Sequence, residues 1–174
     1  TLLTSSPAFS QSSLLERAKD GTVAELERAI RNGARISIEN RDSQTPLLVA
    51  AEQNAHPGVI ELLLEEGADV HARDEDGRTA LMTAAAENEH PGIVKALLEG
   101  GAEVAARDQR LGRTALMLAA GLNPNPEVAA ALLDAGARMS TEDRRVERWN
   151  ALFYAACWND NPEMTALLLE RGAD

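Results

Sequence analysis

Aromatic side chains are scarce in this sequence: two Trp, two Phe and one Tyr make up 3% of its 174 residues. Alanine and leucine are abundant in their place. Such side chains suit closely packed helices better than the thick core of a β-sandwich. The composition therefore favours a helical protein whose neighbouring helices lie near one another.

Cysteine, long apolar runs and basic charge are lacking as well. Cys157 is the single cysteine, so an intramolecular disulfide is impossible. No apolar run approaches the roughly 18 residues that a membrane-spanning helix needs. Lys and Arg number 17 against 28 Asp and Glu, a formal net charge of −11. This charge argues against general binding to nucleic acid or anionic lipid, because both depend on a basic surface.

The first ten residues, TLLTSSPAFS, show no pattern of a folded element. Ala8-Phe9-Ser10 is similar to the end of a secretory signal, but a charged n-region is missing and Leu2-Leu3 is the only apolar stretch. We expect residues 1–11 to form a flexible leader and the protein to be cytoplasmic. Export is the alternative if Thr1–Ser10 is the remnant of a signal peptide.

Four segments of the chain repeat one another: TPLLVAA from Thr45, TALMTAA from Thr79, TALMLAA from Thr114 and NALFYAA from Asn150. A Gly-Ala pair always follows 22 residues after the opening residue, whereas the distance from that Gly to the next opening residue varies from 12 to 14. A unit of fixed length thus alternates with a connector that tolerates insertion, as loops do.

Each unit is predicted to hold two antiparallel helices. The opening Thr or Asn is a good N-cap for the first helix. Asn tolerates the left-handed conformation that ends a helix, and we expect it to do so at Asn54, Asn88, Asn123 and Asn159. Three residues later comes a Pro suited to the first turn of the second helix, which ends at the recurring Gly. A shorter pair over residues 12–34 carries Arg17 where later units have Ala, as a terminal capping repeat requires.

These phrases resemble ankyrin repeats, which have a turn and two helices at a period near 33 and open with T-P-L-H-x-A. Thr45-Pro46-Leu47 and Ala50-Ala51 match this pattern. The family's His is replaced in every unit, and the turn between helices is one residue longer, which we interpret as a bacterial-type repeat. The resemblance implies an all-α ankyrin-repeat solenoid with short β-hairpin-like fingers. It covers residues 12–174 as a single domain, with a cap at 12–34 and helical pairs beginning at 45, 79, 114 and 150.

The fourth, seventh and eighth residues after each opening residue differ in every unit, so packing does not dictate them. In ankyrin proteins these positions and the finger tips line a concave binding surface. Trp, Tyr and Arg, the types most enriched at binding hot spots, gather at its late end. The candidate partner-binding residues are Arg113, Leu122, Arg144, Arg145, Arg148, Trp149, Tyr154 and Trp158. The alternative is that the tryptophans belong to the core and the arginines pair with nearby acids.

The repeat pattern does not bring together residues that could form a catalytic, metal-binding or nucleotide-binding site. His56 and His90 are one repeat apart, about 8–10 Å, which is too far for one metal ion. Cys157 has no His in its own helix pair, and nucleotide-binding motifs are missing. We therefore expect no catalytic residue, metal or cofactor.

The function predicted is a protein–protein interaction module. The arginines predict a partner segment that is acidic and carries apolar residues. One alternative is a structural or self-association segment of a longer repeat protein, stacking through the C-terminal repeat. A second alternative is the regulatory arm of an enzyme encoded outside this chain.

Overall fold

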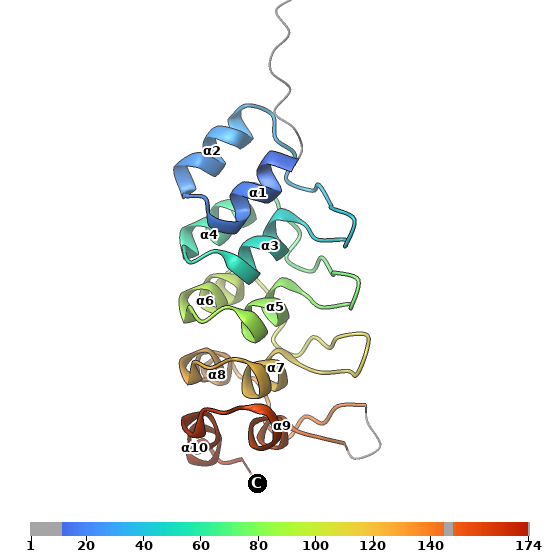
Figure 1. The fold of residues 1–174 in the computed structure, drawn as a ribbon, viewed down its shortest axis with the longest axis vertical. Helices are drawn as coiled ribbons and strands as arrows, with labels where there is room; N and C mark the ends of the chain where they lie inside the picture. The colour runs from blue at the N-terminus through green and yellow to red at the C-terminus, as the bar shows by residue number, and fades with distance from the viewer. Residues whose placement is uncertain (1–11, 145–147, 174) are drawn as a thin grey trace, which may run out of the picture.

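The computed structural model describes residues 12–144 and 148–173, and in this part of the chain it contains ten helices and no strand. The helices form antiparallel pairs stacked along one axis (Figure 1). The pairs are α1 (Ser12–Asp20) with α2 (Val23–Arg31), α3 (Pro46–Gln53) with α4 (Pro57–Glu65), α5 (Ala80–Glu87) with α6 (Pro91–Glu99), α7 (Ala115–Leu122) with α8 (Pro126–Asp134), and α9 (Ala151–Trp158) with α10 (Pro162–Glu170). The predicted leader, residues 1–11, lies outside the described residues.

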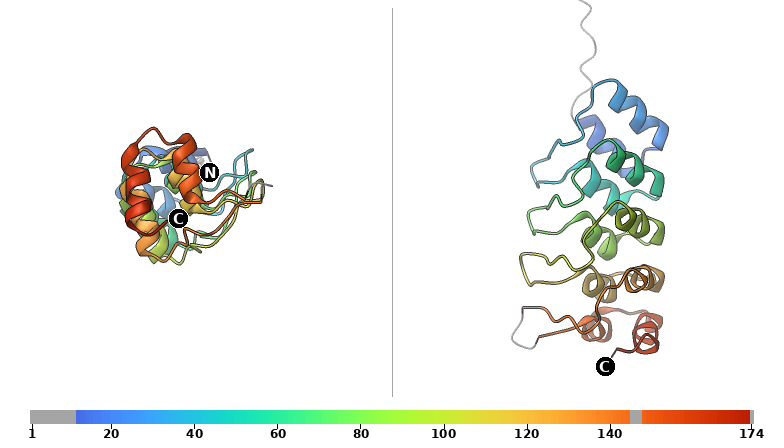
Figure 2. Two further views of the ribbon diagram at one scale, coloured as in Figure 1. Left: turned by 90° about the horizontal axis from the view of Figure 1, so that it is seen from below. Right: turned by 180° about the vertical axis from the view of Figure 1, so that it is seen from behind.

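The odd-numbered helices form one column of the stack and the even-numbered helices form the other. Long loops that precede α3, α5, α7 and α9 project from the odd-numbered column, all toward the same side (Figure 2). These loops are the predicted fingers. An isolated antiparallel bridge joins Arg73 and Thr79, so the fingers are hairpin-like without forming strands among the described residues. The all-α solenoid predicted from the sequence is confirmed.

Side-chain capping bonds begin five of the ten described helices where the sequence predicted them. Thr45, Thr114 and Asn150 accept hydrogen bonds from the amides of the residues three positions later. Asn125 and Asn161 cap α8 and α10 in a similar way. His56 and His90 occupy the same N-cap position but make no capping bond through their side chains.

Alanine fills the interfaces between successive odd-numbered helices. Ala50, Ala84, Ala119 and Ala155 stand at equivalent positions and are fully buried. Because alanine adds so little volume, adjacent helices approach closely, and leucines of the paired helices fill the space beside them. One continuous core therefore runs through the whole stack.

The four asparagines that end the first helix of each unit do not adopt the left-handed conformation that the sequence suggested. All four are extended, with φ between −83° and −100°. Their side chains are used instead. The amide of Asn88 donates to the carbonyls of Ala51 and Asn54 in the preceding repeat, at 3.1 and 2.9 Å, while its oxygen accepts from the amide of His90.

The same three bonds recur at the other three asparagines. Asn54 donates to Ala18 and Gly21, Asn123 to Ala85 and Asn88, and Asn159 to Ala120 and Asn123. We call Asn54, Asn88, Asn123 and Asn159 the asparagine ladder. It satisfies buried backbone carbonyls at the helix ends and fixes each repeat on the one before it.

Each finger is organised by one Asn or Asp whose side chain accepts hydrogen bonds from backbone amides further along the finger. These residues are Asn40, Asp74, Asp108 and Asp143. In each case the residue's own amide also donates to the carbonyl of the residue just before the helix N-cap. All four lie seven residues after the Gly that ends the preceding helix pair. The insertions in the later fingers therefore fall beyond this residue, toward the finger tip.

Neighbouring fingers are joined by arginine. Arg107 donates through Nη1 to the carbonyl of Gly112 in its own finger and to that of Glu142 in the next, at 2.6 and 2.8 Å. Arg73 makes the equivalent pair of bonds one repeat earlier. The left-handed turn at Gly112, with φ of 70°, brings its backbone against the side chain of Arg144. The fingers thus stack as the helices do.

Candidate functional site

The face shared by the odd-numbered helices and the fingers is defined by contacts that the fingers make with these helices. The residue just before each N-cap reaches the end of the helix that follows. Gln44 donates to Glu52 at 3.1 Å, and Arg78 pairs with Glu87 at 3.3 Å. We call this the inner face. It corresponds to the surface that the sequence singled out as variable between units.

Aromatic side chains gather at the late end of the inner face. Trp149, at the base of the last finger, lies against Phe153, Tyr154 and Trp158 of α9, with ring centroids 4.4, 6.2 and 4.9 Å away. The centroid of Tyr154 is 4.9 Å from that of Trp158. Four of the chain's five aromatic residues therefore form one cluster, and Trp158 remains 44% exposed within it.

Tyr154 is the buried member of this cluster. It is only 4% exposed, and its hydroxyl donates to Oδ2 of Asp143 at 2.8 Å. Its ring fits beside α7 because position 121 is glycine; a Cβ at Gly121 would lie 3.2 Å from the ring. The sequence predicted Tyr154 as an anchor for a partner. Because its side chain is buried, it offers a partner little surface, and its ring instead positions Trp158.

A shallow hollow of about 170 Å³ lies on the inner face between α7 and α9. It is lined by Arg113, Leu118, Leu122, Tyr154 and Trp158. Leu122 is 53% exposed and is one of few large apolar side chains that the described residues leave in solvent. An apolar side chain of a partner would lose water against Leu122 and Trp158 together, which is the usual source of binding energy at a hot spot.

Arg113 is held at the edge of the hollow by a buried carboxylate. Its Nε donates to Oδ2 of Asp108 at 2.7 Å, and its side chain is 13% exposed. Burial by itself raises the pKa of Asp108. The hydrogen bonds from the Arg113 side chain and from the amides of Leu111 and Arg113 outweigh that effect and lower the pKa overall. Arg113 thus lines the hollow with its charge balanced by Asp108.

Arg144 and Arg148 lie on the last finger and do not line this hollow. Arg144 and Arg148 are exposed and line a second, polar hollow of about 490 Å³ with Arg107, Arg138, Ser140, Thr141, Glu142 and Asp143. Arg148, with φ of 53°, pairs with Glu142 at 2.6 Å. Arg145 lies outside the described residues. The predicted set therefore separates into an aromatic part, which includes Arg113, and a finger part.

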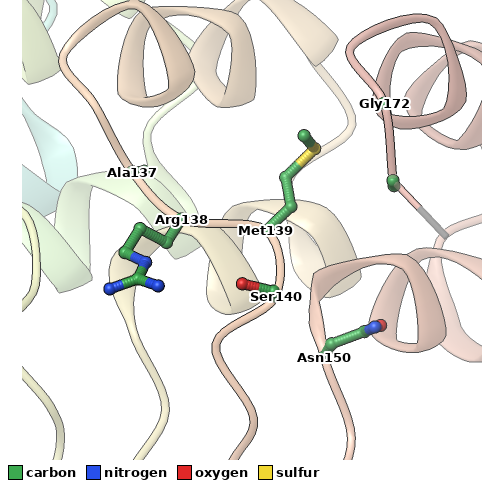
Figure 3. Close-up of a pocket in the computed structure, with 7 residues that line it drawn as sticks. Ala137, Arg138, Met139, Ser140, Asn150 and Gly172 are labelled. Carbon is green, nitrogen blue, oxygen red and sulfur yellow. The ribbon is translucent and has the colours of Figure 1, made fainter.

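A third hollow of about 290 Å³ lies at the C-terminal end, between the loop after α8 and the ends of α9 and α10 (Figure 3). It is lined by Ala137, Arg138, Met139, Ser140, Asn150, Gly172 and Ala173. In Figure 3 the side chain of Arg138 points away from Met139, and the remaining lining groups are small or neutral. These groups offer no pair suited to acid–base chemistry.

The described part of the chain contains no group of three His, Cys, Asp or Glu side chains placed to hold a metal ion. None of its helices is both long and apolar enough to cross a bilayer.

Three residues of the site were not selected from the sequence. Asp108 and Asp143 hold Arg113 and Tyr154 in place, and Leu118 lines the hollow. The constant spacing of seven residues after Gly101 and Gly136 could have identified both aspartates. Leu118 stands at the same position of its unit as Tyr154, so the variable positions did contain its signal.

A family model described as ankyrin repeats (three copies) matches residues 14–108 and again residues 85–174. No curated protein matches the chain.

Proposed function

The chain belongs to the ankyrin-repeat family, whose repeats are generally protein-interaction modules and typically non-enzymatic; on this premise we propose that it binds a partner protein through the late half of its inner face. The observation that carries the proposal is the exposed pair Leu122 and Trp158 beside one hollow. Exposed large apolar side chains that adjoin one another mark interaction sites on soluble proteins. The rings of Trp149 and Tyr154 pack against Trp158, and Arg113 lines the same hollow.

Arg144 and Arg148 belong to this proposal as a polar rim, and Arg145 joins them as a prediction from the sequence alone. Their expected role is to contact polar groups of the same partner at the finger tips. Rim charges change association rates and salt dependence more than they change affinity, so their removal should have a smaller effect than loss of an anchor.

Matched surface variants test the proposal. The chain is immobilised and used to capture proteins from the cells that produce it, and each retained protein is quantified. The double variant Leu122→Ser/Trp158→Ala should lose its specific partner, with truncation of the anchors costing about 2 kcal/mol or more of binding free energy, roughly thirtyfold in Kd. Thermal melts should show that the variant folds.

Leu169→Ser is the control, because Leu169 is equally exposed, at 54%, but lies on α10 in the other helical column. It should retain the partner. Loss of capture in the Leu169 variant, with normal capture by Leu122→Ser/Trp158→Ala, would show that the inner face is not the binding surface.

Self-association is a second candidate, favoured by the exposure of Leu169 and Phe153 on the last helix pair. Sedimentation equilibrium of the parent and of Leu169→Ser tests it. A concentration-dependent dimer that the substitution abolishes would support stacking through the C-terminal repeat. A monomer at all concentrations would argue against it.

A further inference from the structure

The hollow between α7 and α9 continues a column of side chains that runs along the inner face. Each member is the eighth residue after the N-cap of its helix, so the members follow one another from α3 to α9: Gln53, Glu87, Leu122 and Trp158. The column changes from polar and acidic to apolar. A partner that lies along it meets both surfaces.

The acidic half of the column has more negative charge than its neighbours neutralise. Glu87 pairs with Arg78, but Glu52 on the adjacent helix receives hydrogen bonds from Gln44 and Gln53, which are neutral. Desolvation by the surrounding side chains raises the pKa of Glu87, and the negative charges of Glu52 and Asp74 raise it further, against the opposing effect of Arg78. Among the described residues, this part of the inner face therefore holds more carboxylate charge than Arg78 alone balances.

Three arginines near the apolar half already have carboxylate partners. Arg113 is bonded to Asp108, Arg148 to Glu142, and Arg110 lies 3.4 Å from Asp76. Because these guanidinium groups already have carboxylate partners, they attract an acidic ligand only weakly. The sequence-based expectation of an acidic partner thus loses the support of Arg113 and Arg148.

We propose, building on the proposed function, that the partner segment is basic and apolar. It places a Lys or Arg side chain against Glu52 and Glu87, and an apolar side chain in the hollow between Leu122 and Trp158. Successive repeats are about 9 Å apart, so the hollow lies roughly 13 Å from Glu87 along the stack. An extended segment rises about 3.3 Å per residue, which separates its basic and apolar side chains by about four residues.

Selection from random dodecapeptides displayed on phage tests the chemistry of the segment without knowledge of the natural partner. The parent chain should enrich sequences with Lys or Arg about four residues from Leu, Met, Phe or Trp. An enriched peptide is then synthesised, and its Kd is measured by fluorescence anisotropy in low and high salt.

Charge variants identify where the basic side chain binds. Glu52→Gln/Glu87→Gln should weaken the peptide at least tenfold in low salt, and the difference should shrink as salt screens the charges. Glu61→Gln/Glu65→Gln is the matched control, because it removes the same net charge from exposed positions on α4. Its Kd should stay within twofold of the parent value.

Four results would overturn the inference. Enrichment of acidic or uncharged sequences whose binding still requires Trp158 would reject the basic segment while leaving the proposed function intact. Binding that is indifferent to both Trp158→Ala and Leu122→Ser would reject the inference and the proposed function together. Equal weakening by the α4 control would reduce the charge effect to the overall field of an acidic protein, and failure to enrich any sequence would count against the segment as well.

Discussion

The hydroxyl of Tyr154 on α9 donates to Oδ2 of Asp143, 2.8 Å away in the preceding finger, and both residues are buried. The same carboxylate accepts through Oδ1 from the amide of Trp149. One aspartate therefore fixes the base of the last finger and the ring that supports Trp158. The finger and the aromatic cluster are held as one unit.

Removal of the Tyr154 hydroxyl should lower stability considerably, although the change deletes a single oxygen atom. Tyr154→Phe leaves a buried carboxylate oxygen without this donor, and we expect the free energy of unfolding to fall by about 1–3 kcal/mol. Urea unfolding followed by circular dichroism measures it. Phe153→Leu, at an exposed neighbouring position, should change stability by less than about 1 kcal/mol. Equal effects of the two substitutions would mean that ring packing, and not the hydrogen bond, holds Tyr154.

The asparagine ladder should contribute strongly to stability. Asn88→Ala removes two donors from buried carbonyls and the acceptor of the His90 amide, so we expect a loss of about 2–4 kcal/mol in urea unfolding. His90→Ala, two residues away, should be nearly neutral because the His90 side chain makes no capping bond. A stable Asn88 variant would show that water replaces the ladder at little cost.

Arginine residues of one finger should differ sharply in their effects. Arg107→Ala removes the bonds to the carbonyls of Gly112 and Glu142, and should destabilise the protein by about 1–2 kcal/mol. Arg110→Ala removes only an exposed ion pair with Asp76 and should cost less than about 0.5 kcal/mol. Thermal melts of the two variants, with amide hydrogen exchange of residues 108–113, distinguish local loosening of the finger from global loss. Equal stability of the two variants would argue that Arg107 does not hold the neighbouring fingers together.

Acid should weaken the protein partly through Asp108. Because the pKa of this carboxyl is lower in the folded chain than its ordinary value of 3.8, its stabilising effect is present above that value and is lost as the pH falls below it. The free energy of unfolding of the parent should therefore fall more steeply between about pH 4 and pH 2 than that of Asp108→Asn. Urea titrations at several pH values measure the slopes.

Asp134→Asn is the control for this pH effect. Asp134 is exposed and pairs with Arg171 at 2.8 Å on the surface, so its substitution should leave the slope close to that of the parent. A parent and an Asp108 variant with parallel pH profiles would mean that the buried carboxyl titrates as it does in the unfolded chain.

Local signals explain what the sequence predicted correctly. The N-caps and the prolines at the second helices act within a single turn, so α4 begins at Pro57 and α8 at Pro126 as expected. The fixed length of each unit gave the pairing of helices. Such features depend on few residues and are readable without the rest of the fold.

The features that sequence reasoning missed depend on contacts between repeats. The side chain of Asn88 finds its acceptors 34 and 37 residues earlier, and Arg107 binds a carbonyl 35 residues later. The burial of Tyr154 depends on the missing side chain at Gly121 in another helix. Residue type alone suggested a helix end at Asn88 and an anchor at Tyr154, because the neighbour that decides each role belongs to an adjacent unit.

The asparagine ladder gives the stack a direction, since every rung donates toward the N-terminal side and offers carbonyls toward the C-terminal side. Each unit thus carries the same donor, its asparagine side chain, and the same acceptors, its backbone carbonyls. If residues 79–113 were excised, Asn123 would meet the carbonyls of Ala51 and Asn54 that Asn88 now uses, and the joint would need no new chemistry. Duplication or deletion of whole units during descent could therefore lengthen or shorten such a chain without loss of these hydrogen bonds. A break inside a unit would separate its asparagine donor from its carbonyl acceptors.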